Sequence, residues 1–106
     1  AKAKGRRLQQ QFRDLLIEEL GIHPEDIESR SMGAGGEDLI MARAAREKFP
    51  YSIECKNRQD YKQVYNAFKQ AKRHTALEPL LVLKMNREQP IAVLDMEHFF
   101  ELVGKE

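Results

Sequence analysis

A helix-forming segment lies between two segments that have strand patterns, and this order strongly limits the folds open to the chain. Residues 60–74 carry apolar side chains at helical spacing and a polar opposite face. Residues 51–56 alternate between apolar and polar side chains, and residues 80–83 form the apolar run Leu-Leu-Val-Leu, typical of a strand covered on both faces. Because two strands joined by a crossover helix usually pair in parallel, we expect a sheet with at least one parallel pair.

The other segments complete an alternation of helices and strands. A first helix is expected over residues 6–20, and a last one after Asp95, which suits a helix N-cap. The charged residues 43–48 are expected to form a turn or the tip of a hairpin. The expected strands are residues 26–32, 39–42, 51–56, 80–83 and 90–94. We therefore predict a single α/β domain over residues 1–106, with a mixed central sheet of about five strands flanked by helices in the order α-β-β-β-α-β-β-α.

Composition indicates a globular protein without naming its partner. Hydrophobic residues make up 42% and charged residues 33% of the chain, and the formal net charge is only +1. No apolar run reaches membrane-spanning length, so no membrane partner is expected. The single cysteine, Cys55, favours a reducing compartment such as the cytoplasm, or is simply a buried small residue. Basic residues gather near the N-terminal end, where they either bind phosphates or only keep the segment hydrated.

Two carboxylates and one lysine lie on neighbouring predicted strands. Asp38 immediately precedes residues 39–42, while Glu54 and Lys56 share one face of residues 51–56, because side chains alternate along a strand. Two carboxylates about 4 Å apart would repel each other by roughly 4 kcal/mol at an effective dielectric constant near 20. A hard cation such as Mg²⁺, which prefers oxygen ligands, reverses that cost. The alternative is an exposed ion pair between Glu54 and Lys56, worth under about 1 kcal/mol.

Together, these residues and the order of elements resemble the PD-(D/E)XK nuclease superfamily. The series Asp38 … Glu54-Cys55-Lys56 is similar to its signature, and the order of helix, three strands, helix and strand is similar to its core. Within it, the chain resembles archaeal-type Holliday junction resolvases and small phage nucleases. Those proteins have a Lys-Gly opening before the first helix and a Ser-x-Gly-rich loop before the aspartate. The matching segments here are Lys4-Gly5-Arg6-Arg7 and Ser31-Met32-Gly33-Ala34-Gly35-Gly36.

The likeness spans roughly residues 4–83 and includes two departures. Glu37 stands where the name of the signature has proline. The first helix of these nucleases often carries a glutamate that assists the metal, whereas the matching stretch here is Gln9-Gln10-Gln11. Gln9 or Gln10 could take that place as a neutral ligand, or could be a solvated helix position.

The resemblance implies hydrolysis of DNA phosphodiester bonds with Mg²⁺, for which Mn²⁺ can substitute. It implies that Asp38, Glu54 and Lys56 are catalytic, and that Asp38, Glu54 and the backbone carbonyl of Cys55 bind the metal. The metal would activate water and polarise the phosphoryl oxygen, and Lys56 would stabilise the developing charge. The assisting residues implied by the likeness are Gln9, Gln10, Ser31 and Glu37. The likeness also implies that Ser31 contacts DNA, and the basic end of the chain adds Lys4, Arg6, Arg7 and Arg13 as expected DNA-binding residues.

The expected activity is that of an endonuclease acting on Holliday junctions or other branched DNA in a bacterial, archaeal or phage-infected cell. Two alternatives stay open. The chain could be another structure- or site-specific nuclease of the same superfamily, such as a flap, nicking, homing or restriction-like enzyme. It could also be a DNA-binding domain without catalysis.

A homodimer is expected, because symmetric cutting of a junction needs two sites and one domain supplies one. Residues 91–94 and the apolar face of the last helix are expected to help form its interface, or else only close the core. The three histidines lack metal-ligand spacing. Tyr61, Tyr65 and Phe68 are interpreted as core residues of the helix over 60–74, rather than as a surface on which bases stack.

Overall fold

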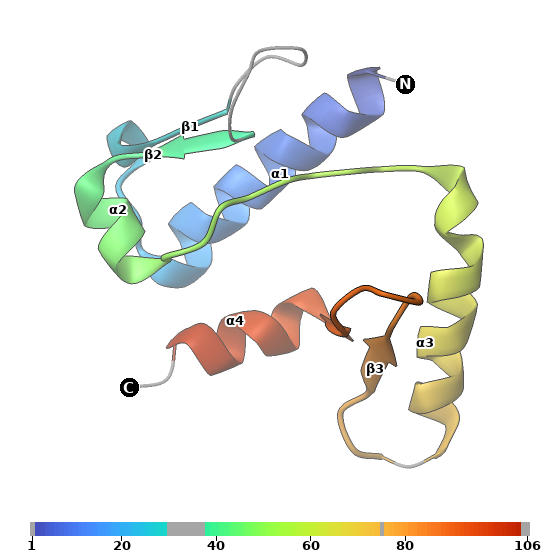
Figure 1. Cartoon of the computed structure of the whole chain (residues 1–106). Coiled ribbons are helices and arrows are strands. Elements are labelled where there is room, and N and C mark those ends of the chain that lie inside the picture. Colours follow the sequence, from blue (N-terminus) through green and yellow to red (C-terminus); the bar gives the residue numbers. More distant parts are fainter. Residues whose placement is uncertain (1, 30–37, 75, 105–106) are drawn as a thin grey trace. The chain divides into compact units, whose positions relative to one another are not determined.

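Figure 1 shows the computed structural model, which describes residues 2–29, 38–74 and 76–104. Over these residues the chain forms four α-helices and two separate two-stranded antiparallel sheets. The α/β class is therefore confirmed, whereas the described residues form no five-stranded mixed central sheet. The chain divides into two compact units, residues 1–57 and 58–106, and the prediction of a single domain stays a prediction. No helix of the described part combines the length and the apolar character needed to cross a membrane.

The first unit packs a long helix along a short hairpin (Figure 1). Helix α1 spans Lys2–Leu20 and includes the predicted helix. It ends at Gly21, whose φ of 67° is a left-handed conformation that glycine adopts without strain. The other elements of this unit are the 3₁₀-helix η1 (Pro24–Asp26), β1 (Ile27–Ser29), β2 (Leu39–Met41) and α2 (Arg43–Lys48). Both predicted strands are thus confirmed, while residues 30–32 of the first lie outside the described part.

The core of the first unit lies between α1 and the hairpin. Strands β1 and β2 pair antiparallel with Ile27 opposite Met41 and Ser29 opposite Leu39. Phe49, only 2% exposed, closes this core, with its ring centroid 6.1 Å from that of Phe12 and 4.6 Å from that of Tyr51. Among the residues of this unit that the structure describes, the buried apolar ones are Phe12, Leu16, Ile22, Ile27, Leu39, Met41, Ala45, Phe49, Ile53 and Cys55.

The turn predicted over residues 43–48 is wrong, because this segment forms the helix α2. Its sequence, Arg-Ala-Ala-Arg-Glu-Lys, consists of strong helix formers. Arg43 and Glu47 form an i, i+4 ion pair over 3.5 Å, and Ala45 is buried at 1% exposure. One buried side chain on an otherwise charged segment gives too weak a periodic signal to predict a helix this short.

The prediction of a paired strand over residues 51–56 is also wrong, although the alternation of buried and exposed side chains is as expected. Ile53 and Cys55 are buried, and Glu54 and Lys56 are exposed. The segment does not form a β-strand, and a backbone hydrogen bond joins it to the hairpin, from the Asp38 N–H to the Ile53 carbonyl over 3.2 Å. The Cys55 N–H donates to the side chain of Asp38 instead of to a strand carbonyl, so no regular ladder forms.

The second unit consists of a helix, a hairpin and a closing helix. Its elements are η2 (Gln59–Tyr61), α3 (Lys62–His74), β3 (Leu80–Leu83), β4 (Ile91–Leu94) and α4 (Met96–Gly104). The helices and strands predicted here are confirmed. The Asp95 cap is confirmed as well: its Oδ1 accepts from the Glu97 N–H over 2.9 Å and from the His98 N–H over 3.4 Å.

The pairing and burial of the second hairpin differ from the prediction. β3 pairs antiparallel with β4, from Leu80 opposite Leu94 to Leu83 opposite Ile91, and the described residues contain no parallel pair. The run 80–83 is not covered on both faces, since Leu80 is 55% and Val82 63% exposed. Helix α3 packs on β3, and a helix on one side of a two-stranded hairpin leaves the alternate side chains of each strand uncovered.

Candidate metal centre and nucleic-acid surface

Two hydrogen bonds hold Asp38 against the segment that carries the other predicted catalytic residues. Its backbone N–H donates to the Ile53 carbonyl over 3.2 Å, and its side-chain Oδ2 accepts from the Cys55 N–H over 2.5 Å. The Cys55 nitrogen belongs to the peptide group that joins Glu54 to Cys55. The Asp38 carboxylate therefore lies against the backbone of Glu54, although the two residues come from different segments.

Glu54 and Lys56 form the ion pair that the strand alternation allows. Lys56 Nζ lies 3.2 Å from Glu54 Oε2, with the two side chains 55% and 61% exposed. Exposed pairs contribute about 0–1 kcal/mol, because solvent screens them and two long side chains lose freedom. Either partner can therefore exchange this contact for a cation or a phosphate at little cost. The predicted ion pair and a metal site are compatible.

The thiol of Cys55 lies within the electrostatic influence of both predicted acidic ligands. The Cys55 side chain is buried, and its burial is the main cause that raises the pKa of the thiol to about 11. The negative charges of Asp38 and Glu54 raise the same pKa further. Both carboxylates thus act electrostatically on the same buried thiol.

The raised pKa of Cys55 predicts that the folded protein loses stability as the pH rises from 9 to 11. Above the ordinary value of 9.0 the unfolded chain releases the thiol proton, while the folded chain keeps it until about 11. The unfolded state then binds fewer protons, so the free energy of unfolding falls with pH, by about 2 kcal/mol in total. Urea unfolding across this range measures the effect. A Cys55→Ala variant with the same pH dependence as the wild type would contradict this assignment.

The predicted ligands carry oxygen atoms of the chemical type that suits a hard cation. They are the carboxylates of Asp38 and Glu54 and the backbone carbonyl of Cys55, all oxygens of the type that Mg²⁺ prefers. The Cys55 N–H takes one acceptor position of Asp38, whereas a carboxylate offers about four. The described residues contain no group of three or more His, Cys, Asp or Glu able to hold a metal. A Mg²⁺ ion here would use two carboxylates and keep several waters, as it usually does.

The predicted assisting residues differ in where the structure places them. Ser31 and Glu37, with the glycine-rich loop, lie outside the described residues. Gln10 is exposed on α1, as expected of a solvated position. Gln9 is not solvated: it is 1% exposed, and its Oε1 accepts from the Ser29 hydroxyl over 3.1 Å. The spacing of Gln9 to Phe12 and Leu16 is the signal that could have predicted its burial on the apolar face of α1.

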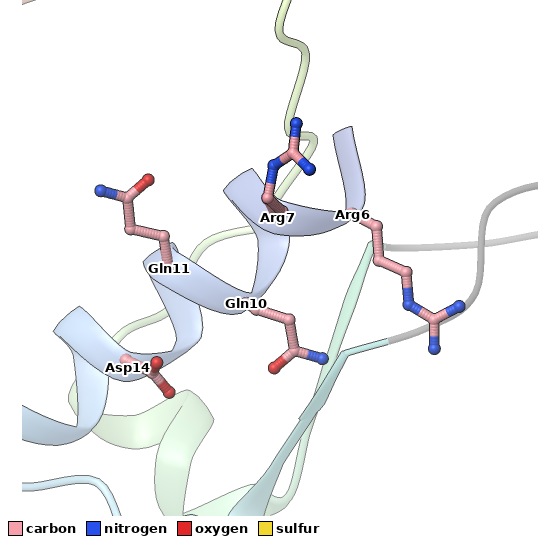
Figure 2. A pocket seen from close by; sticks show the side chains of 5 residues that line it. All are labelled: Arg6, Arg7, Gln10, Gln11 and Asp14. Atoms are coloured by element: carbon pink, nitrogen blue, oxygen red, sulfur yellow. The ribbon is translucent and has the colours of Figure 1, made fainter. Parts of the chain in front are cut away.

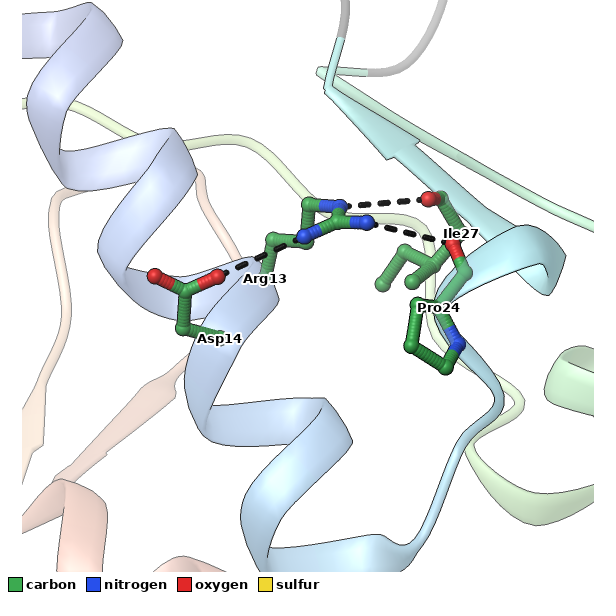
Figure 3. Close-up of polar contacts among 4 residues, drawn as sticks. All are labelled: Arg13, Asp14, Pro24 and Ile27. Atoms are coloured by element: carbon green, nitrogen blue, oxygen red, sulfur yellow. Dashed lines mark hydrogen bonds and ion pairs between the residues drawn. The ribbon is translucent and has the colours of Figure 1, made fainter.

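Arg13, a predicted DNA-binding residue, joins α1 to η1 and the start of β1 (Figure 3). Its Nε donates to the Ile27 carbonyl over 3.2 Å and its Nη2 to the Pro24 carbonyl over 3.1 Å, while Nη1 lies 3.4 Å from Asp14 Oδ1. The guanidinium is engaged by three acceptors of the chain, and the side chain is only 24% exposed. We therefore leave Arg13 out of the nucleic-acid surface.

Arg13→Ala is expected to lower the free energy of unfolding by about 1–2 kcal/mol, since it removes donors to two backbone carbonyls. Arg7→Ala is the matched control on the same helix. Arg7 is exposed, so its loss should change stability by less than about 0.5 kcal/mol. Urea unfolding of the two variants checks this, and equal losses would be inconsistent with a structural part for Arg13.

A shallow hollow of about 680 Å³ on the exposed face of α1 is lined by two basic side chains, two amides and one carboxylate, namely Arg6, Arg7, Gln10, Gln11 and Asp14. Figure 2 shows its lining residues, of which Arg6 and Gln10 point to the same side of the helix. α1 has no acidic residue in its first turn and no basic residue in its last, so its charges run against the helix macrodipole. Such an arrangement costs about 0.3–1 kcal/mol per charge. We call the N-terminal part of α1, with Lys4, Arg6 and Arg7, the basic half of α1. An anion bound there would offset that cost.

Comparisons with protein-family models, curated proteins and solved structures found no match to this chain. A function is therefore inferred from three features of the first unit. These are the bond between the Asp38 carboxylate and the Cys55 amide, the exposed pair of Glu54 and Lys56, and the basic half of α1.

Proposed function

We propose that the protein is a metal-dependent DNA endonuclease with a restriction-endonuclease-like core, related to the PD-(D/E)XK superfamily. The observation that carries this proposal is the hydrogen bond from the Cys55 N–H to the Asp38 carboxylate. It ties one acidic side chain to the backbone of Glu54, whose own carboxylate is exposed and only weakly paired. Asp38, Glu54 and the Cys55 carbonyl hold Mg²⁺ or Mn²⁺ in this proposal.

Each residue of the site then has a distinct part in phosphodiester hydrolysis. When bound, the metal supplies Lewis acidity that favours the attack of water on the phosphate. The Cys55 N–H orients the Asp38 carboxylate, so that this ligand is held before the metal arrives. Lys56 forms only an exposed pair with Glu54, so it would be free to change partner if that carboxylate held the metal. Its ammonium would then donate to the phosphoryl oxygen on which negative charge grows.

The basic half of α1 supplies the contacts to the DNA backbone. Lys4, Arg6 and Arg7 are exposed there, and Gln10 adds a neutral donor beside them. Phosphate contacts of this kind position a protein on DNA without reading its sequence, and they weaken as salt is added. This surface therefore favours recognition of DNA structure rather than of a base sequence. Such a protein would act in the cytoplasm.

The substrate that we propose is branched DNA such as a Holliday junction, cut by a homodimer. Ile91 in β4 and Leu102 in α4 are 61% and 46% exposed, whereas Phe100 is buried at 6%. Phe100 therefore closes the core, and Ile91 and Leu102 offer apolar surface to a second copy. Sedimentation at micromolar concentration is expected to show a dimer that Leu102→Lys weakens. A monomer both with and without DNA would argue against this assembly.

One cleavage experiment tests the proposed activity. The protein is incubated with a four-way junction, a flap and a linear duplex, each with Mg²⁺ and with EDTA. Symmetric nicks confined to the junction are expected with Mg²⁺, and none with EDTA or with Lys56→Gln. Cutting of all three substrates would show a nuclease of broader specificity. Binding without cutting of any substrate would overturn the enzymatic proposal in favour of a DNA-binding domain.

A further inference from the structure

A groove of about 540 Å³ lies in the second unit, between α3 and the junction of β4 with α4. Phe68, Leu94 and Met96 are among the apolar side chains that line it. Its size falls within the range of about 300–1,000 Å³ that is usual for small-molecule sites. The groove is thus large enough to receive a planar ring system.

An exposed aromatic side chain lines this groove. Tyr65 was interpreted from the sequence as a core residue, but it is 63% exposed, whereas Phe68 on the same stripe is 9% exposed. The packing of α3 on its own unit therefore uses Phe68 and leaves Tyr65 in contact with solvent. A solvated aromatic face beside an apolar hollow offers a stacking partner to a flat ligand.

The rim of the groove is positively charged. Lys69 and Lys72 line it, and Lys72 Nζ lies 5.5 Å from the centroid of the Phe68 ring. The α3 sequence Lys-Gln-Val-Tyr-Asn-Ala-Phe-Lys-Gln-Ala-Lys-Arg-His contains no acidic residue. Asp95 also lines the groove, but its Oδ1 accepts from two backbone N–H groups at the start of α4, where the helix dipole compensates its charge. The groove as a whole favours an anion.

We propose that this groove binds an unpaired nucleotide of a DNA strand, with its base stacked on Tyr65 and its phosphate between Lys69 and Lys72. An apolar hollow with an aromatic wall and a cationic rim matches the two parts of a nucleotide, a π face and a phosphate. A purely apolar peptide segment bound in the groove would offer no negative charge to the ammonium groups of Lys69 and Lys72. The inference rests on the proposed function, because branched DNA exposes unpaired nucleotides at flaps, bulges and opened branch points.

A tryptophan at position 65 provides the probe, because the chain contains no other tryptophan. The Tyr65→Trp variant is titrated with a short oligothymidylate in EDTA, and its fluorescence is expected to be quenched as bases stack. By fluorescence anisotropy, Tyr65→Ala should bind the same oligonucleotide about tenfold more weakly, while Tyr65→Phe keeps the affinity. Lys69→Gln and Lys72→Gln should each lose more affinity than Lys62→Gln, which removes the same charge from α3 away from the groove.

Three results would overturn the assignment of the groove. These are unchanged affinity in a folded Tyr65→Ala variant, equal losses in Lys62→Gln and Lys69→Gln, and quenching that depends on protein concentration without DNA. The last result would mean that a second copy of the chain occupies the groove. Because binding is measured in EDTA, the two proposals fail separately. If the protein cleaves DNA but Tyr65 has no part in binding, only the proposal for the groove is overturned. If the oligonucleotide quenches the fluorescence but no Mg²⁺-dependent cleavage occurs, only the nuclease proposal is overturned.

Discussion

Replacing Asp38 with alanine is expected to lower the free energy of unfolding by about 2 kcal/mol and to abolish cleavage at the same time. The loss of stability follows because the Cys55 N–H, in a partly buried position, loses its acceptor. A donor left unsatisfied in this way costs about 1–3 kcal/mol. The loss of activity follows because the proposed metal loses one of its two carboxylates.

Asp38→Asn is the matched variant that separates these two effects. The asparagine keeps a side-chain oxygen that can accept from the Cys55 N–H, so its stability should stay within about 1 kcal/mol of the wild type. Its cleavage rate should nevertheless fall at least about a hundredfold, because the negative charge that holds the metal is gone. Urea unfolding and junction nicking measure the two quantities. Equal unfolding of the Ala and Asn variants, or efficient cleavage by the Asn variant, would contradict the role given to Asp38.

Phe49→Ala is expected to lower the free energy of unfolding by about 3–5 kcal/mol, the usual cost of deleting a buried aromatic ring. Phe49 is 2% exposed and its ring packs on those of Phe12 and Tyr51, so the deletion leaves a cavity between α1 and the segment after α2. A loss of this size is a large part of the roughly 5–15 kcal/mol that stabilises a typical domain. The measurement is urea unfolding followed by circular dichroism.

Tyr51→Ala is the control for this prediction, since it removes a neighbouring aromatic ring that is 43% exposed. It should cost about 1 kcal/mol. Similar losses of unfolding free energy in the two variants would mean that Phe49 is not a central residue of the first unit's core. Because Phe49 is followed within a few residues by Ile53 and Glu54, Phe49→Ala should also weaken cleavage, and it should raise the Mg²⁺ concentration needed for half-maximal rate.

The sequence predicted the longer helices well and the sheet poorly, for physical reasons. α1 and α3 have apolar stripes that repeat over several turns, a signal carried by local spacing alone. α2 has only six residues, and Ala45 is its one buried side chain. Strand pairing depends on partners that are distant in the sequence, so the alternation over 51–56 predicted which side chains are buried but not which backbone they pair with.

The sequence proposed the residues of the candidate site, but it could not give their contacts. The sequence singled out Asp38, Glu54 and Lys56, and the structure brings Asp38 to the segment that holds the other two. That a side-chain oxygen of Asp38 replaces a strand carbonyl as the acceptor for Cys55 is decided by three-dimensional geometry, which spacing does not encode. For the same reason a helical stripe could not reveal that Tyr65 is exposed while Phe68 is buried.

Paramagnetic broadening by Mn²⁺ tests most directly whether Asp38 and Glu54 hold a metal ion. Mn²⁺ is added in small amounts to the isotope-labelled protein, and the backbone amide resonances are followed by NMR. The amides of Asp38, Glu54, Cys55 and Lys56 should broaden first, and excess Mg²⁺ should restore them. The Asp38→Asn variant should lose this effect while its spectrum stays that of a folded protein. Sharp resonances at these four amides, while others broaden or none do, would contradict the proposed metal centre.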